Sequence, residues 1–158
     1  MSPSLSRVVV AGIGNEYRQD DGVGIAVANA VTTALPAVFD IGPIADPLDL
    51  LGKWDYADLA VVIDATRSGA APGTVTCMDL DDPSVTLQGA QPSSTHGLGV
   101  PDVMRLARVL LAAPQRVVLI GIEGREFNDG SSMGRAVQES VPRAAALVIE
   151  LVAEALDV

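Results

Sequence analysis

The fold of this chain is decided at residues 7–24, RVVVAGIGNEYRQDDGVG, where an apolar run meets a glycine-rich connection and then a helical pattern. Residues 7–11, RVVVA, are apolar and mostly β-branched after Arg7, without polar alternation, which is typical of a parallel strand buried on both faces. The run ends at Gly12, and from residue 21 apolar residues recur with helical spacing as far as Pro36. The stretch therefore predicts a strand, a turn and a helix, the first unit of an α/β fold.

Apolar runs and amphipathic stretches alternate along the rest of the chain, with no internal repeat and no domain linker. This alternation argues for an open, mainly parallel five-stranded sheet with helices on both faces. Residues 1–158 are expected to form a single domain. Strands are expected at 7–11, 37–41, 59–63, 73–78 and 115–122, and helices at 21–35, 46–53, 101–113 and 133–156, the last kinked or divided at Pro142.

The composition excludes several kinds of partner. The chain has 20 Asp and Glu against 10 Lys and Arg, a formal net charge of -10, which repels nucleic-acid phosphates and anionic lipid surfaces. No apolar stretch reaches the ~20 residues of a membrane-spanning helix, and the N-terminal residues lack a signal-peptide pattern, so we expect a cytoplasmic protein with no membrane partner. Cys77 is the only cysteine, which excludes a disulfide framework and a thiolate-rich metal site within one chain.

Two aspartates and the only histidine stand where the ends of parallel strands are expected to meet. Asp21 follows the first strand, Asp64 closes the third, and His96 lies in the loop before a helix. Ligands of open α/β sheets bind beyond the carboxyl ends of the strands, so these three side chains can converge. Two carboxylates and an imidazole suit a borderline divalent ion and leave positions open for water or substrate. The sequence therefore indicates a reactive metal site.

Plainer roles exist for the same residues. An aspartate just before a helix commonly caps it, so Asp20 or Asp21 can be an N-cap. His96, in the polar segment SSTHGLG, can be a surface residue. Asp64 is harder to explain in this way, because a carboxylate beside an apolar strand is partly desolvated and needs a cation or hydrogen-bond donors.

Three other motifs point to different chemistry. The GIGN turn lacks the third glycine of a dinucleotide-binding motif, although Asp40 stands where a ribose-binding acid is found. The segment GSSMG matches the G-x-S-x-G pattern with Ser132 as nucleophile, but the preceding strand ends about eight residues too early for a nucleophile elbow. Cys77 can in principle pair with His96, yet its setting, GTVTCM, favours a small buried thiol.

Four segments in this order, GIGNEYRQDDGVG, VVIDA, SSTHGLG and VVLIGIEG, resemble the maturation endopeptidases of [NiFe]-hydrogenases, the hydrogenase maturation protease family. The resemblance spans nearly the whole chain. In that family the second acid of the first motif, the strand-end aspartate and the loop histidine bind metal, which implies metal-binding and catalytic roles for Asp21, Asp64 and His96. Asp20 is then expected to orient these ligands by hydrogen bonds. The residues expected to shape the loop are Gly12, Gly14, Asn15 and Gly22.

The resemblance also implies a fold and an activity. Members of the family have a three-layer α/β/α sandwich around a small twisted sheet, a phosphorylase/hydrolase-like fold. They remove a short C-terminal extension from the precursor of the hydrogenase large subunit after nickel insertion. We therefore expect an endopeptidase whose nickel is supplied by the precursor rather than permanently bound. Two alternatives are a non-catalytic chaperone that binds the precursor's nickel site and a serine hydrolase that uses Ser132.

Overall fold

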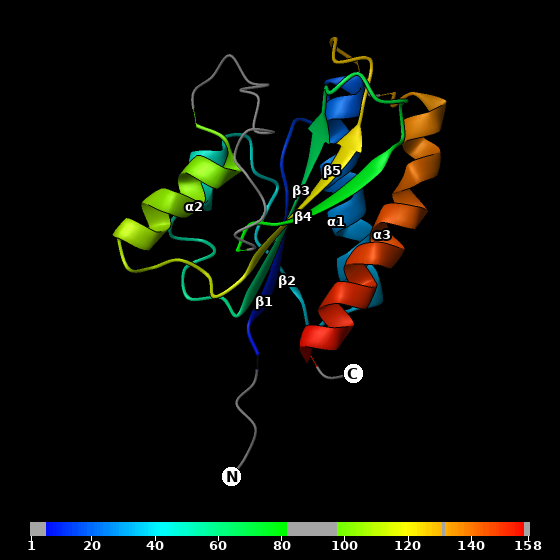
Figure 1. Ribbon diagram of the computed structural model, residues 1–158. Coiled ribbons are helices and arrows are strands. Elements are labelled where there is room, and N and C mark those ends of the chain that lie inside the picture. The colour runs from blue at the N-terminus through cyan, green and yellow to red at the C-terminus, as the bar shows by residue number, and fades with distance from the viewer. Residues whose placement is uncertain (1–5, 82–97, 131, 157–158) are drawn as a thin grey trace.

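The computed structural model describes residues 6–81, 98–130 and 132–156, which form a central twisted sheet with helices on both faces (Figure 1). The five strands lie in the order β2-β1-β3-β5-β4, and neighbours run parallel except β4, which is antiparallel to β5. The strands are β1 Val8–Gly12, β2 Phe39–Asp40, β3 Leu59–Thr66, β4 Val75–Asp79 and β5 Val117–Glu123. The helices are α1 Val23–Ala34, α2 Val100–Val109 and α3 Arg135–Leu156, with short 3-10 helices η1 Gln19–Gly22 and η2 Pro47–Leu50.

The helices form two outer layers around the sheet. Helices α1 and α3 pack against each other on one face, and α2 and η2 contact each other on the opposite face (Figure 1). Val8 and Val10 of β1 belong to the core under α1 and α3, whereas Val9 belongs to the core that contains Trp54. Successive side chains of a strand point to opposite faces, so a sheet covered on both sides requires strands that are apolar throughout. This is why β1 is buried along its whole length.

Strand β3 is longer than its apolar run predicts. Asp64, Ala65 and Thr66 remain paired with β5, and Asp64 lies opposite Gly121. The prediction that Asp64 closes the strand is therefore wrong by two residues. Asp64 sits inside the β3–β5 ladder, opposite Gly121, where β5 holds its backbone on one side.

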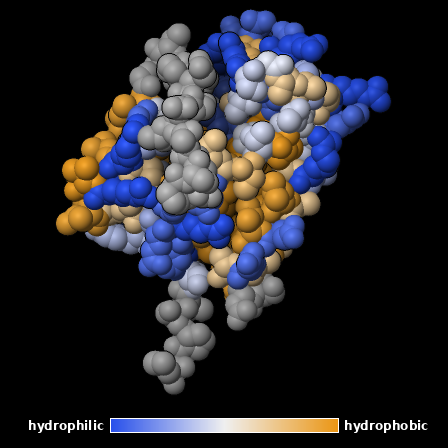
Figure 2. Space-filling view, in the orientation of Figure 1, coloured by the Kyte–Doolittle hydropathy of each residue, from blue (hydrophilic) through white to orange (hydrophobic). Residues whose placement is uncertain are grey.

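Two helices are shorter than the sequence pattern predicts. The helix expected at 46–53 is only η2, which begins after Asp46, whose Oδ1 accepts a hydrogen bond from Leu48 N. Helix α2 ends at Val109, and Leu111 adopts a positive φ of 58° that breaks the helix. As a result, Leu110 and Leu111, which the expected helix at 101–113 included, lie outside α2 and are exposed. With Val109 they form a hydrophobic patch at the end of α2 (Figure 2).

Helix α3 runs through Pro142 without a break, so of the two predicted effects of this proline, a kink or a division, the division does not occur. A proline removes the hydrogen bond to the carbonyl four residues earlier, here that of Gln138. Because Gln138 is exposed, water can bond to this carbonyl. None of the helices in the described residues is long and apolar enough to cross a membrane.

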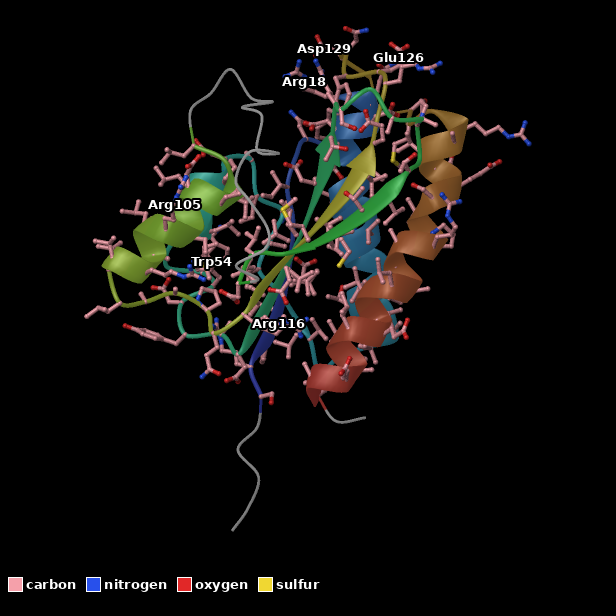
Figure 3. The ribbon with its side chains drawn as sticks, in the orientation of Figure 1. Arg18, Trp54, Arg105, Arg116, Glu126 and Asp129 are labelled. Carbon is pink, nitrogen blue, oxygen red and sulfur yellow. The ribbon has the colours of Figure 1, made fainter. Side chains whose placement is uncertain are left out.

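The carboxyl ends of β3 and β5 lie at one end of the sheet, at the top of Figure 1. We call this end the carboxyl edge, as distinct from the lateral edge formed by strand β4. The labelled side chains of Arg18, Glu126 and Asp129 lie at this edge, whereas Trp54 lies far from it, beside α2 (Figure 3). The segments 13–22 and 124–134, which follow β1 and β5, are joined there by backbone hydrogen bonds, such as the 2.8 Å bond from Gln19 N to Gly130 O. This edge is where the sequence places the candidate site.

Candidate functional site

The connection between β1 and α1 packs directly on the end of β3. Ile13 N donates a 2.8 Å hydrogen bond to the carbonyl oxygen of Ile63. Gly24, in the first turn of α1, approaches the same carbonyl so closely that a Cβ at this position would lie 2.4 Å from it. Only glycine permits this approach. The contact brings the start of α1 beside Asp64, the residue that follows Ile63.

Gly14 and Asn15 hold Asp21 in place within this connection. Gly14 has a φ of 132°, and a Cβ there would lie 2.1 Å from the backbone oxygen of Asp21. An L-residue would therefore be strained and would displace Asp21. Asn15 N donates a 2.9 Å hydrogen bond to Asp21 Oδ2, which orients the carboxylate. The glycine and the asparagine of the GIGN turn thus serve the aspartate six or seven residues later.

Asp21 and Asp64 are brought together at the sheet edge. Asp64 is partly buried within β3. Burial, and then the negative charge of Asp21, raise the pKa of Asp64 from 3.8 to about 7. The effect of Asp21 on Asp64 requires the two carboxyl groups to be near each other. A cation between them would relieve both the repulsion and the cost of burying Asp64.

His96, the third candidate, lies outside the described residues, so the structure brings together two of the three and does not place the other. Within residues 6–81, 98–130 and 132–156, no three His, Cys, Asp or Glu side chains are grouped so that they could hold a metal ion. The described part of the chain therefore offers a pair of carboxylates that needs further ligands. Such ligands can come from His96 or from a second molecule.

Neither Asp20 nor Asp21 caps a helix. The residue before α1 is Gly22, and no side chain caps α1 or η1. Asp20 is only 1% exposed, and its carboxylate accepts hydrogen bonds from Arg125 N (2.8 Å), Glu126 N (2.9 Å) and Gly134 N (2.7 Å). Burial alone would raise the pKa of Asp20, but these three bonds outweigh it and hold the pKa below 3.8. Asp20 therefore ties η1 to the segment between β5 and α3.

The alternative motifs lack the geometry that their chemistry needs. Ser132 is exposed, and residues 124–134 separate β5 from α3, so no sharp turn from strand to helix presents it. The Asp40 carboxylate is used locally, where Oδ1 accepts a 2.9 Å bond from Gly42 N. The structure thus favours neither a nucleophile elbow at Ser132 nor a dinucleotide site at Asp40.

Cys77 is exposed, which corrects the prediction of a small buried thiol. It lies on β4, the edge strand, where most residues are only partly covered. Partial burial, in spite of the nearby positive charge of Arg116, raises the pKa of the Cys77 thiol. A thiol with a raised pKa is a poor nucleophile, so Cys77 is no candidate for catalysis.

Glu123 is a buried carboxylate that sequence reasoning missed. It ends β5, next to β3, and is 3% exposed. The signal was the same as for Asp64, an acid at the end of an apolar strand, but the residues that satisfy Glu123 lie 54 to 57 positions away in sequence. No local sequence pattern predicts hydrogen-bond partners so far away along the chain.

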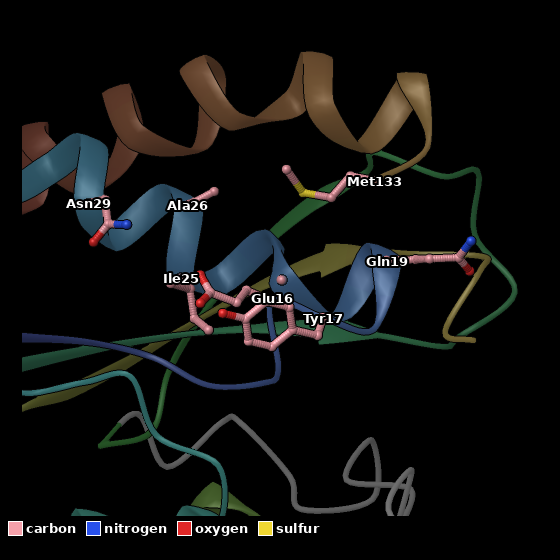
Figure 4. A pocket seen from close by; sticks show the side chains of 8 residues that line it. Glu16, Tyr17, Gln19, Ile25, Ala26, Asn29 and Met133 are labelled. Atoms are coloured by element: carbon pink, nitrogen blue, oxygen red, sulfur yellow. The ribbon is translucent and has the colours of Figure 1, made fainter. Parts of the chain in front are cut away.

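An open pocket of about 400 Å³ is lined by residues of η1, α1 and the segments before η1 and α3 (Figure 4). Gly22, the neighbour of Asp21, lines this pocket, but neither carboxylate of the pair does. The pocket is therefore distinct from the carboxylate pair, although it is lined by the residue that follows Asp21. Its lining residues are Glu16, Tyr17, Gln19, Gly22, Ile25, Ala26, Asn29 and Met133.

This chain is similar to known proteins in both sequence and fold. Residues 25–151 match the HycI family model, described as hydrogenase maturation protease. The hydrogenase expression/formation protein HupD from Rhodobacter capsulatus is 37% identical over 137 residues, covering 83% of this chain and 64% of HupD. The chain thus spans slightly less than two thirds of the length of HupD.

Two solved structures have the same architecture. The crystal structure of the [NiFe] hydrogenase maturation protease HycI from Thermococcus kodakarensis KOD1 superimposes with a TM-score of 0.71 at 30% identity, covering 92% of each chain. The hydrogenase maturating endopeptidase HybD from E. coli superimposes with a TM-score of 0.80, covering 94% of this chain and 93% of that one. Its 24% identity supports the fold alone. The expected three-layer sandwich with a small, mainly parallel sheet is confirmed.

Proposed function

Because this chain belongs to the hydrogenase maturation protease family, we propose that it is the endopeptidase that removes the C-terminal extension from a nickel-loaded [NiFe]-hydrogenase large-subunit precursor. The family is one of peptidases, as the resemblance of the four motifs led us to expect. The observation that supports the proposal most strongly is that the connection carrying Asp21 packs on β3 at Ile63, next to Asp64. We propose that the reaction takes place in the cytoplasm, the location expected from the sequence.

The substrate's own nickel is the ion that this pair would engage, together with His96. Two carboxylates and an imidazole, with no thiolate, form a weak site for a free divalent ion. The precursor's ligands would complete the coordination shell, so binding would depend on nickel already seated in the precursor. This explains how a protease with an incomplete set of metal ligands selects precursors that already contain nickel.

Asp64 has a second property that suits this role. With a pKa of about 7, it is partly protonated near neutral pH in the free protein. A metal ligand must be deprotonated, so engagement of nickel would displace the proton from Asp64. The buried negative charge that the free protein avoids would then be matched by the charge of the substrate's ion. Asp64 thereby stabilises the complex more than it stabilises the free protein.

Catalysis would follow from the position of the ion between the two molecules. Asp21 and Asp64 would fix the nickel against the sheet edge, and the nickel would fix the peptide bond that lies near it in the precursor. A divalent ion can polarise the scissile carbonyl or lower the pKa of a bound water, contributing several kcal/mol to the transition state. The protein's part is to hold the ion and the peptide in one geometry.

The test is intact-mass measurement of the precursor before and after incubation with this protein, with and without nickel. We expect the nickel-loaded precursor to lose the mass of a C-terminal peptide and the nickel-free precursor to keep its mass. Binding of nickel-loaded precursor without any loss of mass would instead identify a non-catalytic chaperone. Equal cleavage of both precursors would show that nickel is not what the protein recognises.

A further inference from the structure

Two segments that carry the candidate residues are attached to the same four residues of the chain. These residues, 123–126, end β5 and begin the segment that leads to α3, and we call them the brace. Asp20, next to Asp21, accepts hydrogen bonds from the brace at Arg125 N and Glu126 N. The end of β3, which carries Asp64, is bound to the brace at Glu123 and Gly124.

Glu123 makes the attachment to β3. Its Oε1 accepts hydrogen bonds from Ser68 N (2.7 Å) and Gly69 N (3.0 Å). Its Oε2 accepts from Thr66 Oγ1 (2.8 Å) and Ser68 Oγ (2.9 Å). The carboxylate therefore organises the whole turn that follows Asp64, starting two residues beyond it.

The environment of Glu123 suits an acceptor rather than a proton donor. Burial alone would raise the pKa of Glu123, but the bonds from Thr66, Ser68 and Gly69 outweigh it and hold the pKa below its ordinary value. The group stays ionised at neutral pH. All of its hydrogen bonds run to one turn, and no arginine or lysine forms an ion pair with it among the described residues.

Further contacts join the same segments. Gly124 N donates a 3.0 Å hydrogen bond to the Thr66 carbonyl. A Cβ on Gly124 would lie 2.9 Å from the Cβ of Asp20, so the absence of a side chain lets Asp20 reach the brace. The Arg67 guanidinium also stacks on the Phe127 ring at 3.8 Å, just beyond the brace. The connection from Asp64 to Asp21 is thus continuous through the turn at 66–69, the brace and Asp20.

We propose that Glu123 is a positioning residue, which sets the placement of Asp64 relative to Asp21 by holding the turn at 66–69 against the brace. The inference rests on the proposed function in taking Asp21 and Asp64 as the pair that engages the substrate. Glu123 does not touch the substrate and acts through hydrogen bonds alone. Its contribution is to geometry, and a displacement of about 1 Å in a reactive site can lower a rate by ~100-fold.

The experiment compares Glu123→Ala with Glu123→Gln in cleavage of nickel-loaded precursor. Alanine leaves Ser68 N and Gly69 N without an acceptor, so kcat should fall about 10- to 100-fold while KM changes by less than about 2-fold. Glutamine keeps an oxygen for these two N–H groups, and the hydroxyls of Thr66 and Ser68 can turn to accept from its amide. Glu123→Gln should therefore retain most of the wild-type kcat.

The matched control is Asp58→Asn, at the opposite end of β3, where the carboxylate accepts a 2.6 Å bond from Arg7 N. This variant should change thermal stability but leave kcat unchanged. A wild-type kcat in folded Glu123→Ala overturns the proposal, and so does an equal loss in Glu123→Gln, which would mean that charge acts rather than geometry. If Glu123→Ala does not fold, Thr66→Val decides, because it removes one bond to Oε2 and should lower kcat several-fold.

A readout without cleavage separates this proposal from the proposed function. In NMR spectra of the free protein, Glu123→Ala or Thr66→Val should shift the backbone amide signals of Asp21 and Asp64 together with those of residues 66–69. Asp58→Asn should leave the Asp21 signal in place. If the wild-type protein cuts no precursor, the proposed function fails, while these shifts still test whether Glu123 positions Asp64 relative to Asp21. Shifts confined to residues 66–69 would overturn it.

Discussion

The Asp64→Asn variant should leave nickel-loaded precursor uncut, with the cleavage rate lowered by at least about 100-fold. Asn has nearly the same shape as Asp, but its amide cannot become an anionic ligand. The nickel would then lose one of the two carboxylates that the sheet edge brings together. The loss should appear in kcat, measured as the initial rate of mass loss at saturating precursor.

The same substitution should not damage the fold, and its effect on stability has a defined sign. The pKa of Asp64 is about 7 in the folded protein and 3.8 as its ordinary value, so the folded state holds the proton more tightly. Stability from this group is complete below pH 3.8 and is lost as the pH rises through about 7. Between about pH 5 and about pH 8 the wild type should lose roughly 2–3 kcal/mol that Asp64→Asn keeps.

Urea unfolding of the metal-free proteins at both pH values measures this difference. A variant that is folded and more stable than wild type at the higher pH, yet inactive, places Asp64 in the reaction rather than in the core. Asp58→Asn, a substitution of the same kind at the other end of β3, should cut at the wild-type rate. Processing of precursor by Asp64→Asn at the wild-type rate would remove Asp64 from the mechanism.

The Asp20→Ala variant should lose about 3–5 kcal/mol of unfolding free energy, the largest effect on stability expected at this edge. Three backbone N–H groups, those of Arg125, Glu126 and Gly134, would lose their acceptor. Each buried N–H without a partner costs about 1–3 kcal/mol. Part of this cost is recovered if water enters, so the sum is less than three full penalties.

The unfolding free energies of Asp20→Ala and Asp129→Ala, measured in urea, test this expectation. Asp129 is an exposed acid on the same segment, at the top of Figure 3, and accepts none of these three bonds. Asp129→Ala should change stability by less than about 0.5 kcal/mol. Equal, small changes in both variants would show that the segment between β5 and α3 does not depend on Asp20.

The sequence predicts the arrangement of strands and helices well because this arrangement depends on local patterns of apolar residues. Uniformly apolar runs identify β1 and β3 as buried strands, and the rule that ligands bind at carboxyl ends selects Asp21 and Asp64 from twenty acids. The roles of the whole candidate set, including His96, stay a prediction, as does the expectation of a single domain. The resemblance to hydrogenase maturation proteases is confirmed by the family match.

The sequence predictions that proved wrong have a common cause. Each concerns a feature that depends on residues distant in sequence. Asp20 was considered as an N-cap because a helix follows it, whereas its hydrogen bonds run to residues more than 100 positions away. The length of β3 depends on pairing with β5, which no apolar pattern reports. Exposure of Cys77 follows from the place of β4 as an outermost strand of the sheet. Such features become visible only when the chain has folded.

X-ray absorption at the nickel edge tests whether this protein binds the nickel of its substrate. Spectra would be recorded from nickel-loaded precursor alone and from its complexes with wild-type protein and with His96→Ala, frozen before turnover. We expect new oxygen and nitrogen neighbours at about 2.0–2.2 Å in the wild-type complex, with one nitrogen fewer in the variant. An unchanged nickel environment in a complex that goes on to cut the precursor would contradict this expectation.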